Sequence, residues 1–419
     1  MKSRRILLAA LLAGLLSACN ALPSPATAAA PAAPPSLLLI SLDGVHPDML
    51  GRGDTPHLDR LAAEGVHAEW MRPAYPALTF PNHYTLVTGL RPDRHGLVHN
   101  AMYDEDLGWF ALKDRAAVGD TRWWEGEPIW VTAERAGLPT ATMFWPGSEA
   151  PVQGVRPTRW SPFQEGLALD IRIGRVLGWL SEPDATRPRL ATLYFEHPDA
   201  AGHGYGPQSP QLREALRQVD GALGDLLAGL DARGLRDRVN LVIVSDHGMA
   251  EVAPGHAIAV EDMVADEDAQ LVSTGQVIGF RPRPGREVEA AATLLGPHEH
   301  YDCWTRETLP ARWHYGTHPR VPPIVCQMHL GWDAIPRAHL ARRPDHARGS
   351  HGYDPDRPEM RAIFIASGPA FRAATTLPGF DNVDVYPLLA HLVGVPPAEH
   401  DGDPTTLQSA LRDAEPIPH

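Results

Sequence analysis

The sequence predicts an α/β fold, in which helices flank a mostly parallel central sheet and loop-rich insertions cover it. Three segments of strand length are almost wholly apolar: Ser36–Leu42, Leu190–Phe195 and Asn240–Val244. Strands buried on both faces of a parallel sheet have this continuous apolar character. Polar, chemically versatile residues follow each segment, and ligands of open α/β sheets bind beyond the carboxyl ends of the strands. The chain of 419 residues is long enough for one large domain with insertions or for two smaller domains.

Composition limits the partners of the protein. The net charge is −14 and the isoelectric point is near 5.8, which argues against a nucleic-acid-binding surface. A phosphate-bearing substrate must therefore be held by local positive charge, which metal ions can supply. The 42 prolines are about twice the average usage and indicate a rigid, loop-rich covering over a regular core.

The N-terminus carries the pattern of an exported lipoprotein. Residues 1–18 are predicted to be a signal peptide, because basic residues precede the apolar run Ile6–Leu16, which is too short for a membrane span. The sequence Leu16-Ser-Ala-Cys19 resembles a bacterial lipobox, so Cys19 is expected to become the lipidated first residue of a tether over 19–35. Asn20, in place of Asp, favours a periplasmic location on the outer membrane by resemblance to Gram-negative lipoproteins. The alternative is a soluble exported protein cleaved nearby.

The predicted domain spans residues 36–410, and its first half supplies three candidate site residues. Asp43 follows the strand Ser36–Leu42 and is either a helix cap or a metal ligand. A helix is expected after Thr55, with Pro56 in its first turn and Gly65 at its end. Thr79 lies at a second helix start, marked by Pro81, where amide dipoles favour negative charge; its alternative role is an N-cap. Asn100 presents an amide in a polar turn after an apolar pair.

The second half supplies the remaining candidates. Asp199 and His203 follow the strand Leu190–Phe195 and are four residues apart, so a helical turn or tight loop would point both inward as oxygen and nitrogen ligands for zinc. A helix opening at Ser209-Pro210 has one apolar stripe and is scaffold. Asp246 and His247 follow the strand Asn240–Val244. His351 is the last candidate residue along the chain. A strand over Met360–Ala366 and a last helix over Val383–Val393 are predicted after it.

Residues 250–345 show weak periodicity and are predicted to be an insertion within the domain rather than a second folded domain. Its aromatic and histidine residues are expected to pack rather than to bind metal; they include His298, His300, Tyr301, Trp304 and Trp313. It also contains Cys303 and Cys326, which in an oxidising compartment form a disulfide or remain two buried thiols.

Together the candidates comprise three carboxylates, three imidazoles and a hydroxyl. They are Asp43, Thr79, Asp199, His203, Asp246, His247 and His351. This set is sufficient for two metal sites about 4 Å apart, as two-metal phosphoryl-transfer sites require.

With these residues the chain resembles the nucleotide pyrophosphatase/phosphodiesterase family of the alkaline phosphatase superfamily, as a bacterial member. The matching pieces are colinear: Ser41–Gly44, Thr79–Tyr84, His95–Gly96 with Asn100–Asp104, Tyr194–Pro207, Val244–Met249, Leu309–Gly316 and His351–Asp354. The resemblance covers roughly 36–400 and implies an alkaline-phosphatase-like core. It also implies two Zn²⁺ ions per chain, one held by Asp199, His203 and His351, the other by Asp43, Asp246 and His247 with Thr79. Manganese or cobalt also suits this ligand set.

The resemblance further implies hydrolysis of nucleotide phosphodiester or pyrophosphate bonds to nucleoside 5′-monophosphates, through a covalent intermediate on Thr79 with Asn100 donating to the phosphate. It places Phe80 and Tyr194 near the second substituent of the substrate, and sequence spacing adds Leu112 and Phe163; ordinary packing is their alternative. A choline- or lipid-type phosphodiesterase on the same fold is a second hypothesis. A non-catalytic binding lipoprotein is a third.

Overall fold

The computed structural model describes residues 34–412 and 416–417. Residues Pro35–His419 form one compact unit, and the predicted signal peptide and nearly all of the tether lie outside the described residues. Within the described part of the chain, no helix is long and apolar enough to cross a membrane.

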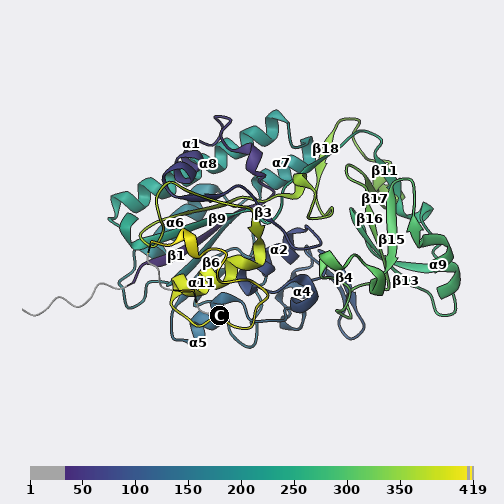
Figure 1. The fold of residues 1–419 in the computed structure, drawn as a ribbon, viewed down its shortest axis with the longest axis horizontal. Helices are drawn as coiled ribbons and strands as arrows, with labels where there is room; N and C mark the ends of the chain where they lie inside the picture. Colours follow the sequence, from purple (N-terminus) through teal and green to yellow (C-terminus); the bar gives the residue numbers. More distant parts are fainter. Residues whose placement is uncertain (1–33, 413–415, 418–419) are drawn as a thin grey trace, which may run out of the picture. The chain divides into compact units, whose positions relative to one another are not determined.

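A central eight-stranded sheet contains the three apolar segments that the sequence singled out (Figure 1). They form β1 (Ser36–Leu42), β8 (Leu190–Phe195) and β9 (Val239–Val244), and every residue of the three strands is buried. β1 lies between β8 and β9 and pairs with both in parallel. The full strand order is β20-β2-β19-β9-β1-β8-β6-β7, in which the outer strands are β20 (Thr375–Leu377), β2 (Val66–Ala68), β6 (Thr140–Met143) and β7 (Arg159–Ser161). The sheet is mostly parallel, as predicted; β19 (Phe364–Ser367) is antiparallel to its neighbours β9 and β2.

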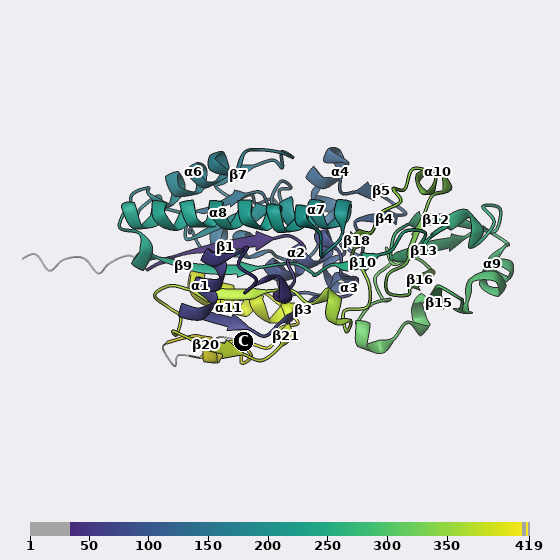
Figure 2. The ribbon, with the colours of Figure 1, turned by 90° about the horizontal axis from the view of Figure 1, so that it is seen from above.

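Helices cover both faces of this sheet, with α6 (Leu169–Leu180), α7 (His197–Tyr205) and α8 (Pro210–Ala232) on one side and α11 (Val385–Val393) on the other (Figure 2). Side chains of a strand alternate between its two faces. Leu38 and Ile40 of β1 accordingly pack with α1 (Pro56–Glu64), α6 (Leu169–Leu180) and α8 (Pro210–Ala232). Leu37 and Leu39 pack with α2 (Thr79–Thr88), α5 (Ile129–Arg135) and α11 (Val385–Val393).

The long helix α8 begins where the sequence predicted. The Ser209 side chain accepts a hydrogen bond from the backbone N–H of Leu212, and Pro210 occupies the first turn. The predicted apolar stripe is buried against the sheet; it consists of Leu212, Leu216, Val219, Leu223, Leu226 and Leu230.

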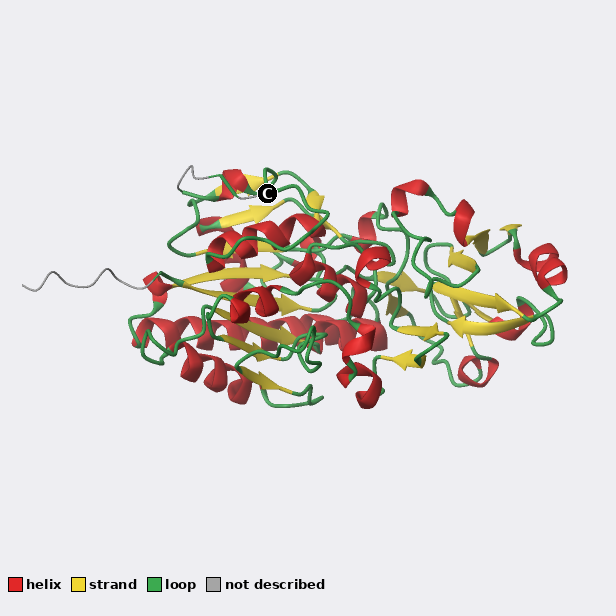
Figure 3. Ribbon diagram, turned by 90° about the horizontal axis from the view of Figure 1, so that it is seen from below, coloured by secondary structure: helices red, strands yellow, loops and turns green. Residues whose placement is uncertain are grey.

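Residues 250–345 form more regular structure than the sequence indicated. They contain a second, five-stranded sheet in the order β12-β13-β16-β15-β14, with its own hydrophobic cluster (Figure 3). Antiparallel pairing of β10 (Ala250–Val252) with β18 (Arg348–Ser350) joins the two ends of the insertion. Polar residues interrupt several of its strands, as in Ala269–Ser273 and Tyr301–Thr305, and proline-rich loops separate them, which weakens the apolar signal in a sequence window.

The aromatic and histidine residues of the insertion pack, as predicted. His298 stacks on Tyr301, His300 stacks on Trp332, and Trp304 meets Trp313 edge to face. Cys303 and Cys326 lie directly opposite each other on β15 (Tyr301–Thr305) and β16 (Ile324–Met328) and form a disulfide, which resolves the alternative that the sequence left open.

The remaining helices are α3 (Pro92–His95), α4 (Arg115–Gly119), α9 (Glu287–Leu294) and α10 (Arg337–Leu340). The remaining strands are β3 (Met71–Arg72), β4 (Ala101–Asp104), β5 (Gly108–Ala111), β11 (Ala257–Ala259), β12 (Ala269–Ser273), β13 (Val277–Pro282), β14 (Gly296–Pro297), β17 (Asp333–Ile335) and β21 (Phe380–Asp381).

Candidate metal centre and active site

The parallel pairing of β8, β1 and β9 brings the predicted ligands to one edge of the sheet. Asp43 follows β1 directly, and its backbone N–H donates to Phe195 O at the end of β8 (3.0 Å). Asp246 is separated from the end of β9 by one residue, Ser245, and its Oδ1 accepts from the backbone N–H of Gly44 (3.2 Å). Both carboxylates are buried, with 1% and 0% of their surface exposed. Carboxylates at such an edge lie where ligands of α/β sheets bind.

Asp43, Asp246 and His247 form one candidate ligand group. His247 Nε2 lies 2.9 Å from Asp246 Oδ2 and 3.6 Å from Asp43 Oδ1. All three residues are buried.

Asp199, His203 and His351 form the second cluster. Asp199 and His203 lie one turn apart on α7, with Asp199 Oδ1 3.5 Å from His203 Nε2. His351, which follows β18, places its Nε2 3.6 Å from Asp199 Oδ1 and 3.0 Å from His203 Nε2. The rings of His247 and His351 stack with their centroids 3.5 Å apart, so the two clusters adjoin. His247 in fact lies within reach of both, since Asp199, His247 and His351 also form a group that can hold one ion.

Backbone carbonyls define the tautomer of all three histidines. The Nδ1 atoms of His203, His247 and His351 lie 3.0, 3.0 and 2.9 Å from the carbonyl oxygens of Gly349, Gly248 and Ala77. A carbonyl oxygen only accepts hydrogen bonds, so each neutral ring carries its proton on Nδ1 and directs the lone pair of Nε2 toward the carboxylates. Metal-ligating histidines show this arrangement.

The donor set fits bound cations. Asp43 Oδ1, Asp199 Oδ1 and Asp246 Oδ2, one oxygen from each predicted carboxylate ligand, are buried and have no hydrogen-bond partner among the described residues. Ligand atoms about 2.0–2.1 Å from a tetrahedral zinc lie about 3.3 Å apart, and the contacts above span 2.9 to 3.6 Å. Burial raises the pKa of Asp43 well above its ordinary value, and the neighbouring Asp246 and Asp199 carboxylates raise it further. A divalent cation at this position would relieve that repulsion.

Thr79 is the first residue of α2, and its hydroxyl faces the first ligand group. The N-cap of this helix is Leu78, so Thr79 does not have the alternative role of N-cap that the sequence also allowed. Its Oγ1 lies 3.3 Å from His247 Nε2. Asn100 Oδ1 accepts from the backbone N–H of Phe80 (2.9 Å), which fixes the amide beside the helix start and leaves its NH₂ as the end that can donate.

The predicted substrate residues lie in different surroundings. Tyr194 is buried and its hydroxyl donates to Asp43 Oδ2 (2.6 Å), so this group orients a candidate metal ligand. Phe80 packs at the cluster on the α2 side of the sheet, and Phe163 at the cluster on the α8 side. Leu112 is tied to the site through its N–H, which donates to Asn100 O (3.0 Å).

Sequence reasoning gave no role to two buried polar residues that contact the site. His83 is fully buried and touches Ser41, the backbone of Thr79 and Asp246. Arg172 is also fully buried and holds Glu196 at the start of α7. His83 lies within the matching piece Thr79–Tyr84, and its partner Ser41 is a polar residue inside an apolar strand, whereas no sequence signal marked Arg172.

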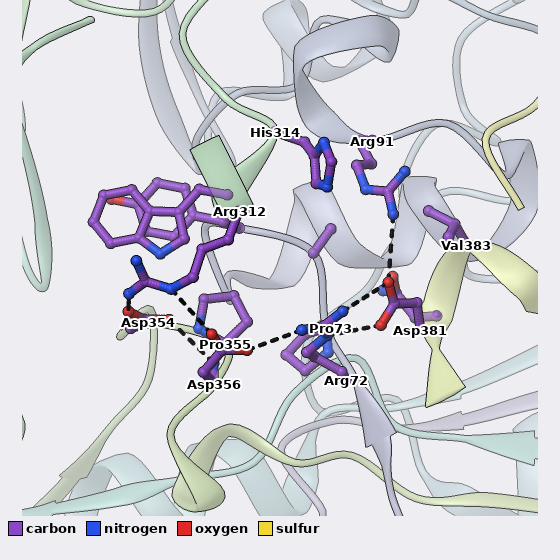
Figure 4. Close-up of a pocket in the computed structure, with 14 residues that line it drawn as sticks. Arg72, Pro73, Arg91, Arg312, His314, Asp354, Pro355, Asp356, Asp381 and Val383 are labelled. Atoms are coloured by element: carbon purple, nitrogen blue, oxygen red, sulfur yellow. Dashed lines mark hydrogen bonds and ion pairs between the residues drawn. The ribbon is translucent and has the colours of Figure 1, made fainter. Parts of the chain in front are cut away.

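A small cavity of about 30 Å³ lies elsewhere, and its lining includes none of the seven predicted metal or nucleophile residues (Figure 4). Its charged groups are paired: Arg72 with Asp356 and Asp381, Arg91 with Asp381, and Arg312 with Asp354 and Asp356. The cavity has room for about one water molecule. We therefore assign it no ligand.

The fold and the site together define an α/β protein of the alkaline-phosphatase-like class with candidate metal-binding groups beyond its central strands. Residues 37–354 match the family described as type I phosphodiesterase / nucleotide pyrophosphatase, and the chain belongs to this family. The family consists of phosphodiesterase/nucleotide pyrophosphatase enzymes, and this chain is an enzyme of that class.

Comparisons with individual proteins agree with this assignment. The chain is 36% identical to an uncharacterized pyrophosphatase/phosphodiesterase of Schizosaccharomyces pombe, covering 90% of this chain and 80% of that protein. It is 34% identical to bovine ectonucleotide pyrophosphatase/phosphodiesterase family member 3, over 90% of this chain and 44% of the relative, so it spans less than half of that protein. The bacterial origin that the sequence indicated stays a prediction.

Solved structures give the same result. Human ectonucleotide pyrophosphatase/phosphodiesterase 5 superposes with a TM-score of 0.85 at 32% identity, over 90% of this chain and 100% of that chain. An inactive form of the murine protein, in complex with AMP, superposes with a TM-score of 0.84 at 34% identity and the same coverage.

Proposed function

We propose that this enzyme hydrolyses nucleotide phosphodiester or pyrophosphate bonds and releases nucleoside 5′-monophosphates, with Thr79 as the nucleophile. The observation that carries the proposal is the position of the Thr79 hydroxyl, at a helix start and 3.3 Å from a histidine of the candidate metal centre. The AMP complex of the murine relative supports a nucleotide substrate.

We propose two Zn²⁺ ions as the native cofactor. Asp199, His203 and His351 would hold one ion, and Asp43, Asp246 and His247 would hold the other together with Thr79. When bound, these ions make the threonine alkoxide accessible at neutral pH and stabilise negative charge on the phosphate and leaving oxygens. The unpartnered carboxylate oxygens and the directed Nε2 lone pairs support this assignment.

The residues of the chain then act in two half-reactions. The Thr79 hydroxyl gives up its proton to solvent and Oγ1 attacks phosphorus; the new P–Oγ1 bond forms, and the bond to the leaving oxygen breaks with its electron pair on that oxygen, which leaves the nucleotide esterified to Thr79. A water molecule then attacks phosphorus and gives up a proton to solvent; the P–Oγ1 bond breaks with its electron pair on Oγ1, and the nucleoside monophosphate leaves. The amides at the start of α2 favour the negative charge near Thr79. The Asn100 NH₂ group, fixed by Phe80 N–H, would donate to a phosphate oxygen throughout.

The substrate pocket is proposed to lie beside Thr79. Phe80 is its next residue, Leu112 is hydrogen-bonded to Asn100, and Phe163 contacts Tyr194, with ring centroids 6.0 Å apart. Aromatic faces in these positions would suit a nucleobase.

We also propose export and anchoring through the lipidated Cys19 to the periplasmic side of the outer membrane. The lipobox-like sequence supports this location. The Cys303–Cys326 disulfide supports an oxidising compartment. Incorporation of labelled fatty acid by the full chain, lost in Cys19→Ala, would test the anchor.

The test of function compares two substrates on the purified, zinc-loaded mature chain: the nitrophenyl ester of thymidine 5′-monophosphate and nitrophenyl phosphate. We expect a preference for the diester, abolished in Thr79→Ala and partly kept in Thr79→Ser. Thr88→Ser, on the same helix but hydrogen-bonded to Tyr84 O, is the matched control and should retain full activity. Preference for the monoester would indicate a phosphatase. Turnover of neither would point to a choline or lipid diester, and zinc content well below two per chain to a binding protein.

A further inference from the structure

A fully buried histidine, His83, lies in the first turns of α2, the helix that begins with the proposed nucleophile Thr79, and has no role in the reaction proposed above. His83 lies four residues after Thr79 on α2, and none of its surface is exposed. Its Nδ1 is 2.8 Å from the carbonyl oxygen of Thr79, and its Nε2 is 2.8 Å from Ser41 Oγ. The same Nδ1 lies 3.3 Å from Asp246 Oδ2.

These partners determine how the ring is protonated. The Thr79 carbonyl can only accept, so His83 Nδ1 carries a proton and donates it there. In the neutral ring Nε2 then accepts from the Ser41 hydroxyl. The positive end of the Nδ1–H bond also faces the Asp246 carboxylate, whose Oδ2 accepts no hydrogen bond from the part of the chain that the structure describes. Both ring nitrogens are therefore engaged.

Neighbouring aromatic rings hold the plane of the imidazole. Trp145 and Tyr194 each meet His83 edge to face, with ring centroids 5.1 Å apart in both pairs. The Trp145 indole N–H also donates to the carbonyl oxygen of His83 (3.0 Å). A ring held in this way has no alternative rotamer without the loss of several contacts.

Three segments that build the site thus meet at one side chain. Ser41 belongs to β1, which is followed directly by Asp43; Thr79 begins α2; and Asp246 follows β9. We propose that His83 is a positioning residue that holds the backbone of the nucleophile Thr79 in register with the ligand carboxylate of Asp246. The inference rests on the proposed function and deepens it, because it states what fixes the nucleophile relative to the metal centre.

The chain contains a matched comparison for simple core packing. His95 is also fully buried, and it also contacts one hydroxyl and one backbone carbonyl: Thr85 Oγ1 (3.0 Å) and Pro81 O (3.2 Å). Neither partner is a predicted ligand or the nucleophile. Loss of His95 should therefore cost stability by the same kind of contacts, without displacing Thr79 or Asp246.

The experiment measures kcat and KM on the thymidine ester, and zinc affinity by competition with a chelator, for His83→Leu and His95→Leu. Removing a group that orients a metal ligand costs about 10- to 100-fold in metal affinity or activity. We expect His83→Leu to lose that factor in kcat and in zinc affinity with a much smaller change in KM. We expect His95→Leu to melt earlier but to keep both. His83→Asn, whose amide can still donate to Thr79 O, should recover part of kcat.

If folded His83→Leu had the same kcat and zinc affinity as the wild type, the proposal would be overturned. The same holds if His95→Leu lost as much kcat and zinc affinity as His83→Leu. Should His83→Leu fail to fold, Ser41→Ala decides, because it removes only the hydroxyl at Nε2; unchanged kcat and zinc affinity there would overturn the proposal too. If the wild type hydrolyses neither ester, the proposed function fails, while zinc titration of the same variants still decides the role of His83.

Discussion

Replacing Arg172 by methionine should destabilise the protein more than any change on the exposed side of the same helix. The guanidinium has 0% of its side chain exposed and donates to four acceptors. These are Leu167 O and Tyr194 O, both at 2.9 Å, and the two carboxylate oxygens of Glu196 at 2.7 and 2.5 Å. Methionine fills much of the volume but donates to none of them.

The magnitude follows from what Arg172→Met leaves behind. Burial alone would raise the pKa of Glu196, yet the paired Arg172 outweighs burial and holds that pKa below its usual value. Breaking a buried pair from one side costs about 3–5 kcal/mol, because the remaining charge loses its partner. Glu196 keeps 17% of its side chain exposed, and water there reduces the cost. We therefore expect a loss near the lower limit, about 3 kcal/mol.

The assay is urea unfolding of the zinc-free chain followed by tryptophan fluorescence. Arg175→Met is the matched control: Arg175 lies on the same helix, is exposed and, among the described residues, bonds only Ser161 Oγ (3.1 Å), so its loss should change stability by less than about 0.5 kcal/mol. The double variant Arg172→Met with Glu196→Met should recover part of the loss, since both charges are then gone. A loss below about 1 kcal/mol in Arg172→Met, or no recovery in the double variant, would refute the reasoning.

Three further predictions follow from the same structure. Burial lowers the pKa of His95 to about 3 and that of His99 to about 4, below the unfolded value of about 6.5, so the folded state keeps both rings neutral and loses their stabilisation as the pH falls below 6.5. Between pH 6 and 5 these two rings should together lower the stability of the metal-free chain by about 2.4 kcal/mol, and His95→Gln should remove about 1.2 kcal/mol of that loss; an unchanged pH dependence in His95→Gln would contradict the prediction. Reduction of Cys303–Cys326, which are 23 residues apart, should destabilise the five-stranded sheet by about 3 kcal/mol in unfolding with and without dithiothreitol, and the double serine variant should be insensitive to the reductant. Asn100→Asp keeps the acceptor for Phe80 N–H but loses the NH₂ donor, so kcat should fall by about 10²- to 10³-fold at unchanged melting temperature; wild-type kcat would remove Asn100 from the mechanism.

Much of the core could be predicted because its signals are local. The strands β1, β8 and β9 are recognisable in the sequence as continuous apolar runs, and α8 is recognisable as a capped helix with one apolar stripe. The candidate ligands follow those strands directly, so knowing the strand ends was sufficient to propose that Asp43 and Asp246 lie together. The sheet in 250–345 gave no such signal, because polar residues interrupt several of its strands, as in Ala269–Ser273 and Tyr301–Thr305, so they are not continuous apolar runs.

The sequence by itself determined which residues are available for the chemistry: carboxylates and imidazoles beyond apolar strands, and a threonine at a helix start. Only the tertiary structure decided how they are held. It set the order β9-β1-β8, gave Tyr194 a hydrogen bond to Asp43, and placed His83 between Ser41 and Thr79. The physical reason is that hydrophobic periodicity encodes which face of an element is buried, whereas hydrogen bonds between distant buried side chains depend on the register of strands that no local pattern specifies.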